Sequence, residues 1–313
     1  ELEREFYIGE LSNIKKSSLP IIAALGGMIV PASLYMLLNW GSPEQSGAGI
    51  PMATDIAFAI GVLSILGSRI PYSLKVFLTA LAVIDDLGAI VIIAIFYTKS
   101  LSITYLAISL GIWILLIGLN RAGFRRLPVY LLLGLGVWYF MLLSGVHSTI
   151  SGVLLAFAIP FAGGGEDSPS YRLQHFLHKP VAYIILPLFA AANTSIVLNG
   201  SVFSGIFESS SLGIALGLLA GKPIGIFLFS FLGARTGLCS LPEGIDFKSI
   251  LGVGFLGGIG FTMSIFITML AFDAPALVDA SKLMILISST IAGLIGYLWL
   301  FFATNQNGQK FES

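Results

Sequence analysis

The 313-residue chain carries very little charge: only 10% of its residues are Asp, Glu, Lys or Arg, and its formal net charge is zero. Soluble domains carry about 25% charged residues, so this composition excludes an ordinary soluble domain. The sequence has no basic tract, which argues against a nucleic-acid partner. Its single cysteine, Cys239, excludes a disulfide within the chain and is consistent with a reduced loop.

Apolar sequence is abundant instead, since hydrophobic residues make up 56% of the chain. A helix of roughly 20 apolar residues crosses a hydrocarbon core about 30 Å thick. The apolar runs predict an all-α polytopic membrane protein with about ten spans, near residues 19–40, 50–67, 73–98, 101–119, 127–143, 147–162, 174–198, 211–233, 247–272 and 279–302. The turns between them are short, so we expect a single transporter domain over residues 1–313, with 163–170 as a linker between two halves.

Lys and Arg residues are unevenly distributed between the two predicted sides of this bundle. One side, which also holds both chain ends, has thirteen of them: Arg4, Lys15, Lys16, Arg69, Lys75, Arg121, Arg125, Arg126, Arg172, Lys179, Arg235, Lys248 and Lys310. The other side has only Lys99 and Lys282. Because cytoplasmic loops are enriched in basic residues, we expect the C-terminus to be cytoplasmic.

One predicted span, residues 76–97, has two adjacent carboxylates near its centre, Asp85 and Asp86. A carboxylate at that depth costs about 2.5–3.5 kcal/mol on insertion scales. Two adjacent carboxylates also repel each other, so at least one should be protonated or should hold a cation. We interpret the pair as a site that exchanges protons for a cation. The alternative is a structural pair satisfied by hydrogen bonds.

Two predicted spans are interrupted by glycine and proline. In the first, SGAGIPMAT precedes a short apolar run at 56–66, and in the second five glycines lie within residues 252–260. The segments TDIAF (54–58) and TMSIF (262–266) also show a weak likeness. Paired interrupted helices indicate a transporter site at the bilayer midplane, although glycines that only permit close helix packing are the alternative.

Two more charges lie within these spans. Asp55 precedes the helical run of the first broken span, where a carboxylate offsets the unpaired N–H groups of a helix start. Lys222 is the only cation far from the ends of a predicted span, so it needs an anion, and Asp55, Asp85 and Asp86 are available. Snorkelling of Lys222 to an interface is the alternative.

The three histidines are less informative. His147 starts a predicted span and serves equally well as a packing residue or a proton relay. His175 and His178 lie at the cytoplasmic start of another span, where they either sense pH or are inert.

The chain resembles the NhaA family of bacterial sodium/proton antiporters in the segments PIIAALGGMIVPA, IPMATDIAFAIGVLSILGSRIP, LKVFLTALAVIDDLGAI, GVHSTISGV, LPLFAAANTS, LLAGKPIGI, LPEG and GIGFTMSIFI. The resemblance implies an inverted-repeat secondary transporter with two broken, crossing helices. It also implies electrogenic, pH-regulated export of Na⁺ or Li⁺ in exchange for H⁺ across the bacterial inner membrane, without a cofactor. The family has twelve spans, of which this chain would supply the third to the twelfth. The hairpin used for dimer contact would precede them, so we expect the complete protein to be a homodimer.

The resemblance also implies residue roles. Asp85 and Asp86 would bind the cation and the protons, Thr54 and Asp55 would offset the positive helix ends at the crossing, and Lys222 would offset the negative ends. The pH-sensing cluster of the family falls on Glu1, Glu5, Arg172, His175 and His178. Tyr171 and Gln174 depart from the family's pattern there, which leaves open the strength or midpoint of pH control.

Competing functions require different residues. An intramembrane aspartyl protease needs its two aspartates on different helices, and a prenyltransferase needs a second acidic cluster with basic residues nearby, so we do not expect an enzyme. A channel fits the buried titratable groups less well than an exchanger does. The closest alternative is a cation-coupled symporter of an organic anion on a related fold.

Overall fold

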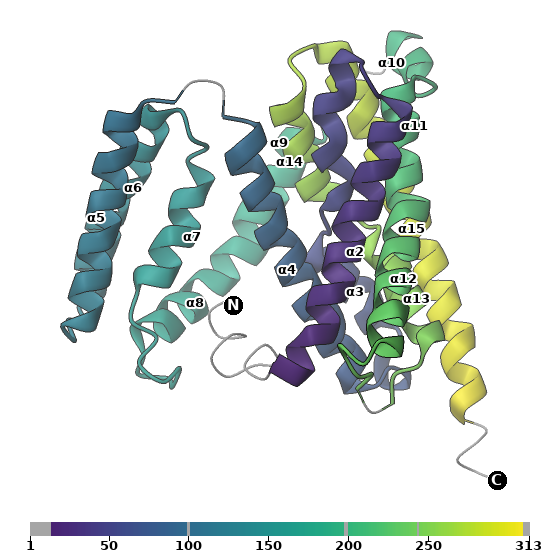
Figure 1. The fold of residues 1–313 in the computed structure, drawn as a ribbon, viewed down its shortest axis with the longest axis horizontal. Coiled ribbons are helices and arrows are strands. Elements are labelled where there is room, and N and C mark those ends of the chain that lie inside the picture. The colour runs from purple at the N-terminus through teal and green to yellow at the C-terminus, as the bar shows by residue number, and fades with distance from the viewer. Residues whose placement is uncertain (1–13, 99–100, 197–199, 243, 309–313) are drawn as a thin grey trace. The chain divides into compact units, whose positions relative to one another are not determined.

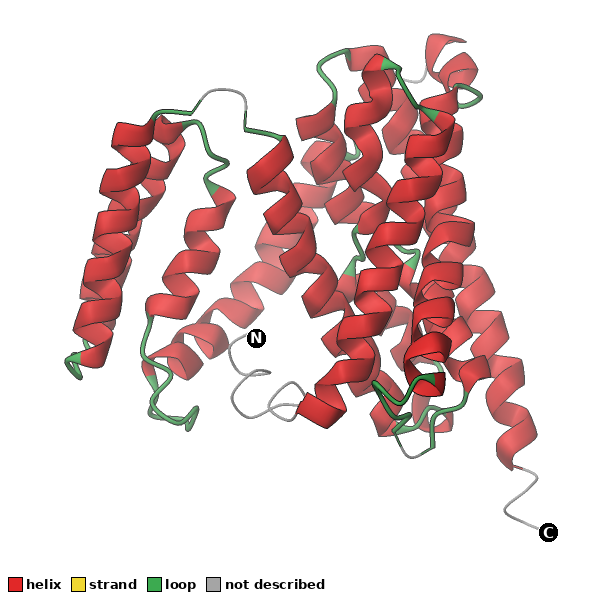
Figure 2. Ribbon diagram, in the orientation of Figure 1, coloured by secondary structure: helices red, strands yellow, loops and turns green. Residues whose placement is uncertain are grey.

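The computed structural model describes residues 14–98, 101–196, 200–242 and 244–308, and within them all regular structure is helical (Figure 2). The helices are α2 (Ile14–Leu38), η2 (Pro43–Met52), α3 (Ile56–Ile65), η3 (Gly67–Arg69), α4 (Tyr72–Phe96), α5 (Ile103–Arg121), α6 (Leu127–Ser144), α7 (Thr149–Ala158), α8 (Pro169–Pro180), η4 (Val181–Ile185), α9 (Leu186–Asn193), α10 (Gly200–Gly205), α11 (Ser209–Leu216), η5 (Gly217–Gly221), α12 (Lys222–Arg235), α13 (Phe247–Gly257), α14 (Phe261–Ala271) and α15 (Pro275–Gly308). The predicted all-α class is confirmed.

Seven of the described helical segments are long and apolar enough to cross a membrane, and the number rises to nine if each of two bent pairs is one span. The one remaining predicted span, near 147–162, contains α7, which has only 10 residues. At 1.5 Å per residue this helix is about 15 Å long, half of a hydrocarbon core. The prediction of a full span there is therefore wrong, and the rest of the multi-pass pattern is present.

The helices group into two compact units, one formed by residues 90–189 and the other by 13–89 together with 190–313. The stretch 163–170 lies inside the first unit, so the prediction that it links two halves is wrong. The single transporter domain expected from the sequence stays a prediction.

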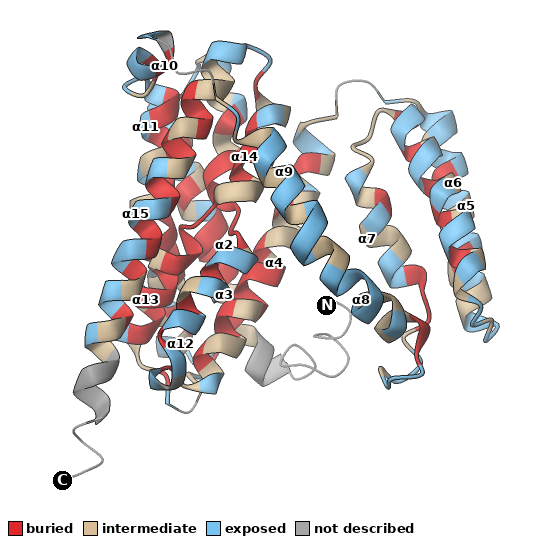
Figure 3. Ribbon diagram, turned by 180° about the vertical axis from the view of Figure 1, so that it is seen from behind, coloured by how far each residue is buried: buried red, intermediate tan, exposed pale blue. Residues whose placement is uncertain are grey.

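The first unit is built on α5 and α6, which run side by side in opposite directions (Figure 1). The hydroxyl of Ser109 on α5 donates to the carbonyl of Val137 on α6 at 2.9 Å. The Trp113 indole donates to the Leu154 carbonyl of α7 at 2.7 Å. Much of the surface of α5 and α6 is exposed (Figure 3) and carries large apolar side chains, as expected for helices that face lipid.

The second unit has a larger core, in which α2 packs along α12. Gly26 and Gly225 bring the two backbones into contact: a Cβ at Gly26 would lie 2.2 Å from the Gly225 carbonyl oxygen, and one at Gly225 would lie 2.1 Å from that of Gly26. Only glycine permits this approach, which small residues allow between membrane helices.

The two interrupted spans are present as bent helix pairs within this unit. The helices η2 and α3 bend by 40° at residues 53–55, and α13 and α14 bend by 48° at 258–260. The first pair begins at Pro43, earlier than the predicted boundary at residue 50. Because η2 packs on α14 while α3 contacts α13, the two pairs cross at their breaks. The predicted broken, crossing helices are confirmed, whereas the inverted repeat stays a prediction.

Candidate cation and proton site

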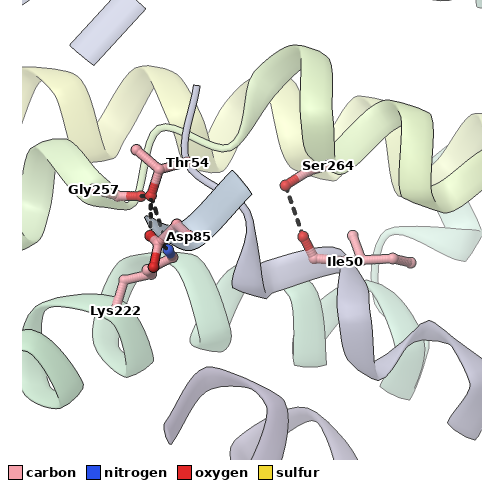
Figure 4. Close-up of polar contacts among 6 residues, drawn as sticks. All are labelled: Ile50, Thr54, Asp85, Lys222, Gly257 and Ser264. Carbon is pink, nitrogen blue, oxygen red and sulfur yellow. Dashed lines mark hydrogen bonds and ion pairs between the residues drawn. The ribbon is translucent and has the colours of Figure 1, made fainter. Parts of the chain in front are cut away.

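Asp85 lies on α4 at the centre of the candidate site and is completely buried. Its Oδ2 accepts a bond from the Lys222 ammonium, with which it forms an ion pair, and a second from the Thr54 hydroxyl at 2.8 Å (Figure 4). Two opposite charges removed from water stabilise a fold only when they are paired and hydrogen-bonded. Asp85 and Lys222 meet that requirement on one side of the carboxylate.

Lys222 reaches Asp85 because of an irregularity in its own helix. The segment η5 is a π-turn directly before α12, and the Lys222 N–H donates to the carbonyl of Gly217, five residues back. Pro223 follows and supplies no N–H group, so the helix cannot return to regular bonding at once. Such π-turns are frequent at functional sites. Here the π-turn directly precedes Lys222, which is fully buried and also donates to the Thr54 hydroxyl at 2.8 Å.

Asp86 is the next residue of α4, about 100° further around the helix axis. Its Oδ1 is buried and has no hydrogen-bond partner among the described residues, and the same is true of Asp85 Oδ1. Buried polar atoms are nearly always paired. Two unpaired carboxylate oxygens on adjacent residues are therefore suited to hold a proton or a cation.

Thr54 connects this carboxylate to the second broken helix. Its hydroxyl oxygen lies 2.8 Å from Asp85 Oδ2 and 2.9 Å from the Gly257 carbonyl, the last of α13 (Figure 4). A hydroxyl has one proton and donates to one acceptor at a time. Thr54 can therefore serve either the carboxylate or the negative end of α13, while Lys222 donates to its oxygen.

Asp55 joins the two breaks rather than pairing with Lys222. Its Oδ1 caps α3 by accepting from the Phe58 N–H at 3.2 Å. Its Oδ2 accepts from the Thr262 N–H at 3.1 Å and also from the Thr262 hydroxyl. Its own N–H donates to the Ile259 carbonyl at 2.6 Å. One carboxylate thus serves the N-terminal ends of two half-helices, whose partial positive charge it offsets.

Three polar residues at the crossing were not predicted as site residues. Thr262 bonds to Asp55, Ser264 donates to the Ile50 carbonyl near the end of η2 at 2.7 Å (Figure 4), and Ser289 accepts from two N–H groups at the start of α14. The likeness of TDIAF and TMSIF contained a signal for Thr262 and Ser264. Nothing in the local sequence marks Ser289, because it comes from the unbroken helix α15.

Three of the five predicted pH-sensing residues lie within the described part of the chain, on a different helix from the carboxylates. Arg172, His175 and His178 are on α8, and the Arg172 guanidinium bonds to Asp167 at 2.8 Å in an exposed ion pair. Exposed pairs contribute little to stability. Glu1 and Glu5 lie outside the described residues. The pH-sensing role of all five residues stays a prediction.

In the part of the chain that the structure describes, no three His, Cys, Asp or Glu side chains gather as a metal-binding group. The candidate site is instead one carboxylate pair on α4, one lysine and the crossing of two broken helix pairs. A buried ion pair at the breaks of two crossing helices is typical of a secondary transporter.

The comparisons with known proteins agree with this class. Residues 1–300 match the family described as Na⁺/H⁺ antiporter 1. The chain is 64% identical over 300 residues to a protein of Flavobacterium psychrophilum named Na⁺/H⁺ antiporter NhaA, a match that covers 96% of this chain and 78% of the relative. Proteins of the same name from Cytophaga hutchinsonii and Escherichia coli O1:K1 are 60% and 50% identical, with the same coverage. The chain belongs to the Na⁺/H⁺ antiporter 1 family, whose members are transporters.

Proposed function

We propose that the protein exchanges Na⁺ for H⁺ across the bacterial inner membrane, with Asp85 and Asp86 as the shared binding groups. The observation that carries this proposal is the pair of unpaired, buried carboxylate oxygens, Asp85 Oδ1 and Asp86 Oδ1, beside the Lys222–Asp85 ion pair. Two adjacent buried carboxylates beside a single lysine carry one negative charge in excess, which a proton or a cation can offset. The relatives reported above are named Na⁺/H⁺ antiporters, and their names do not support the organic-anion symporter.

The exchange follows from competition for the same oxygens. Lys222 already pairs with Asp85, so one negative charge remains at the site. A Na⁺ ion bound by Asp86 and the free oxygen of Asp85 offsets that charge, and so does a proton on Asp86. The two occupants exclude each other because they use the same oxygens. The site can therefore bind either Na⁺ or H⁺ from whichever side of the membrane it is open to. When the site opens to the opposite side, the bound ion is released there and the other ion binds.

Lys222 has a double effect on this competition. Its ammonium lowers the cost of a charged Asp85 when no cation is bound, because it forms an ion pair with that carboxylate. It also repels an incoming cation. We propose that Na⁺ binding weakens the bond between Lys222 and Asp85.

Thr54 and Asp55 support the site by holding the broken helices in register. Asp55 offsets the positive ends of α3 and α14, and Thr54 with Lys222 lies at the negative end of α13. Interrupted helices can shift at their breaks with little loss of regular bonding. We propose that movement at this crossing changes the side from which the carboxylates are accessible.

Further properties rest on the family resemblance and are part of the proposal: transport of Li⁺, electrogenic exchange, pH regulation through Glu1, Glu5, Arg172, His175 and His178, a homodimeric assembly and a cytoplasmic C-terminus. The proposal includes no cofactor, since the family is one of Na⁺/H⁺ antiporters.

The experiment uses proteoliposomes with a preset pH gradient and no organic solute. Addition of Na⁺ should dissipate the gradient in wild-type vesicles and leave it intact in Asp86→Asn vesicles, because the amide keeps the shape but loses the charge. Dissipation that requires an organic anion would contradict the proposal. Equal rates for the wild type and Asp86→Asn would contradict the site.

A further inference from the structure

Helix α14 starts at the second break without a cap from its own sequence. Its N-cap residue is Gly260, and a Cβ there would lie 2.1 Å from Ser264 Oγ and 3.1 Å from Leu218 Cδ2. Ser, Thr, Asp or Asn, the usual N-cap residues, would therefore fit at this position only if the Ser264 side chain moved away from the Ile50 carbonyl to which it donates. By contrast, Asp55 caps α3 and Asp246 caps α13 from their own N-cap positions.

The missing acceptor comes from another helix. Ser289 of α15 accepts from the N–H groups of Gly260 and Phe261, both at 3.2 Å. The next N–H group, that of Thr262, bonds to Asp55. Ser289 is 6% exposed, so bulk water has little access to replace its hydroxyl. The positive end of α14 is thus divided between a carboxylate on the first broken span and a hydroxyl on an unbroken helix.

Bonds from this helix start lead directly to the proposed ion site. The Ile259 carbonyl accepts from the Asp55 N–H at 2.6 Å, and the Gly257 carbonyl accepts from the Thr54 hydroxyl, which also contacts Asp85. The segment 257–262 is held between Ser289 on one side and Thr54 and Asp55 on the other. A shift of the first turn of α14 would therefore move the partners of both Thr54 and Asp55.

We propose that Ser289 is a positioning residue of the cation site: its hydroxyl holds the start of α14 so that Asp55 and Thr54 keep the second break in register with Asp85. This inference rests on the proposed Na⁺/H⁺ exchange. Loss of the hydroxyl leaves two buried N–H groups without an acceptor. Asp55 is then drawn further toward α14, and the segment that contacts Thr54 loses its fixed position.

The test compares Ser289→Ala with Ser289→Thr, which keeps the hydroxyl, and with Ser288→Ala as the matched control. Ser288 is the neighbouring residue of α15, is 1% exposed, and has a hydroxyl without a partner among the described residues. Each variant is reconstituted, and both the apparent KM for Na⁺ and the maximal exchange rate are measured. We expect Ser289→Ala to raise the apparent KM about fivefold or more, since unpaired buried N–H groups are costly. Ser289→Thr and Ser288→Ala should stay within about twofold of the wild type.

If Ser289→Ala does not fold, Ser289→Cys replaces it, because a thiol is nearly the same size but a weak acceptor. It should raise the apparent KM, whereas Ser289→Thr should not. An unchanged KM in Ser289→Ala or Ser289→Cys would overturn the inference, as would an equal increase in Ser288→Ala. These outcomes are distinct from failure of the proposed function, which would appear as absent exchange in the wild type.

Discussion

The ion pair between Lys222 and Asp85 permits a quantitative prediction, because both side chains are completely buried. Lys222→Met removes the cation and leaves a buried carboxylate without its partner, and Asp85→Asn leaves a buried ammonium. Breaking a buried pair from one side costs about 3–5 kcal/mol. At about 2–4 °C per kcal/mol for a chain of a few hundred residues, each single variant should unfold about 10 °C below the wild type.

The double variant Asp85→Asn/Lys222→Met separates the charge effect from packing. It has no buried charge to satisfy, and its amide can still accept from the Thr54 hydroxyl. Replacing a buried pair by neutral residues is often close to neutral. The double variant should therefore be more stable than either single one, so the coupling free energy should be at least as large as one single loss, about 3–5 kcal/mol.

The assay is thermal unfolding of purified protein, followed by intrinsic tryptophan fluorescence in one detergent. The matched control is the same cycle on the exposed pair Arg172–Asp167, for which exposure predicts no measurable coupling. Additive losses in the Asp85/Lys222 cycle would refute the reasoning, since they would mean that the two charges do not stabilise each other.

Three further predictions concern the site and its surroundings. Thr54→Val should slow exchange about tenfold or more while Thr54→Ser keeps it, because only the hydroxyl bonds to Asp85 and Gly257; equal rates of Na⁺-driven proton flux in the two variants would contradict this role. Exchange in proteoliposomes should accelerate with an imposed inside-negative potential that drives protons inward, at about 2.3 kcal/mol per charge per 100 mV. A flux that does not depend on the potential would indicate one-for-one exchange. The exchange rate should also fall at acid pH, because protons then occupy the carboxylates. Burial raises the pKa of the Cys239 thiol in the loop after α12, so less thiolate is present at neutral pH. The folded protein should therefore react with a maleimide far more slowly than the denatured protein does. Equal reaction rates would show that the loop is open.

The membrane class and the helical architecture followed from one-dimensional features. Apolar runs long enough to span a bilayer leave little freedom, since a helix satisfies every backbone group by itself in lipid. The glycines at 252–260 indicated the second break, because glycine weakens a helix interior. The short helix α7 was the exception: its apolar run reaches residue 162, but the helix ends at Ala158, with extended backbone at Ile159.

The candidate site was also predicted in part from the sequence and in part only from the structure. Asp85, Asp86, Asp55 and Lys222 stood out in the sequence, because charge in an apolar span is costly and must be compensated. Which charge pairs with which depends on helix packing: the close approach of α2 and α12 at Gly26 and Gly225, the π-turn before Lys222 and the crossing of the breaks together direct the lysine to Asp85. The role of Ser289 also depends on helix packing, so the sequence did not predict it: a serine on a continuous helix has no distinctive local pattern.

The sequence by itself thus determined that the chain lies in a membrane, where its helices break, and which ionisable residues are buried there, because each of these depends on the local cost of placing polar groups in lipid. Only the tertiary structure decided the partners of those residues: Lys222 with Asp85, Asp55 with the ends of α3 and α14, and Ser289 with the start of α14. Hydrogen bonds and ion pairs act over about 3 Å. Their partners here lie up to 207 positions apart in the chain, so their choice depends on how the helices pack.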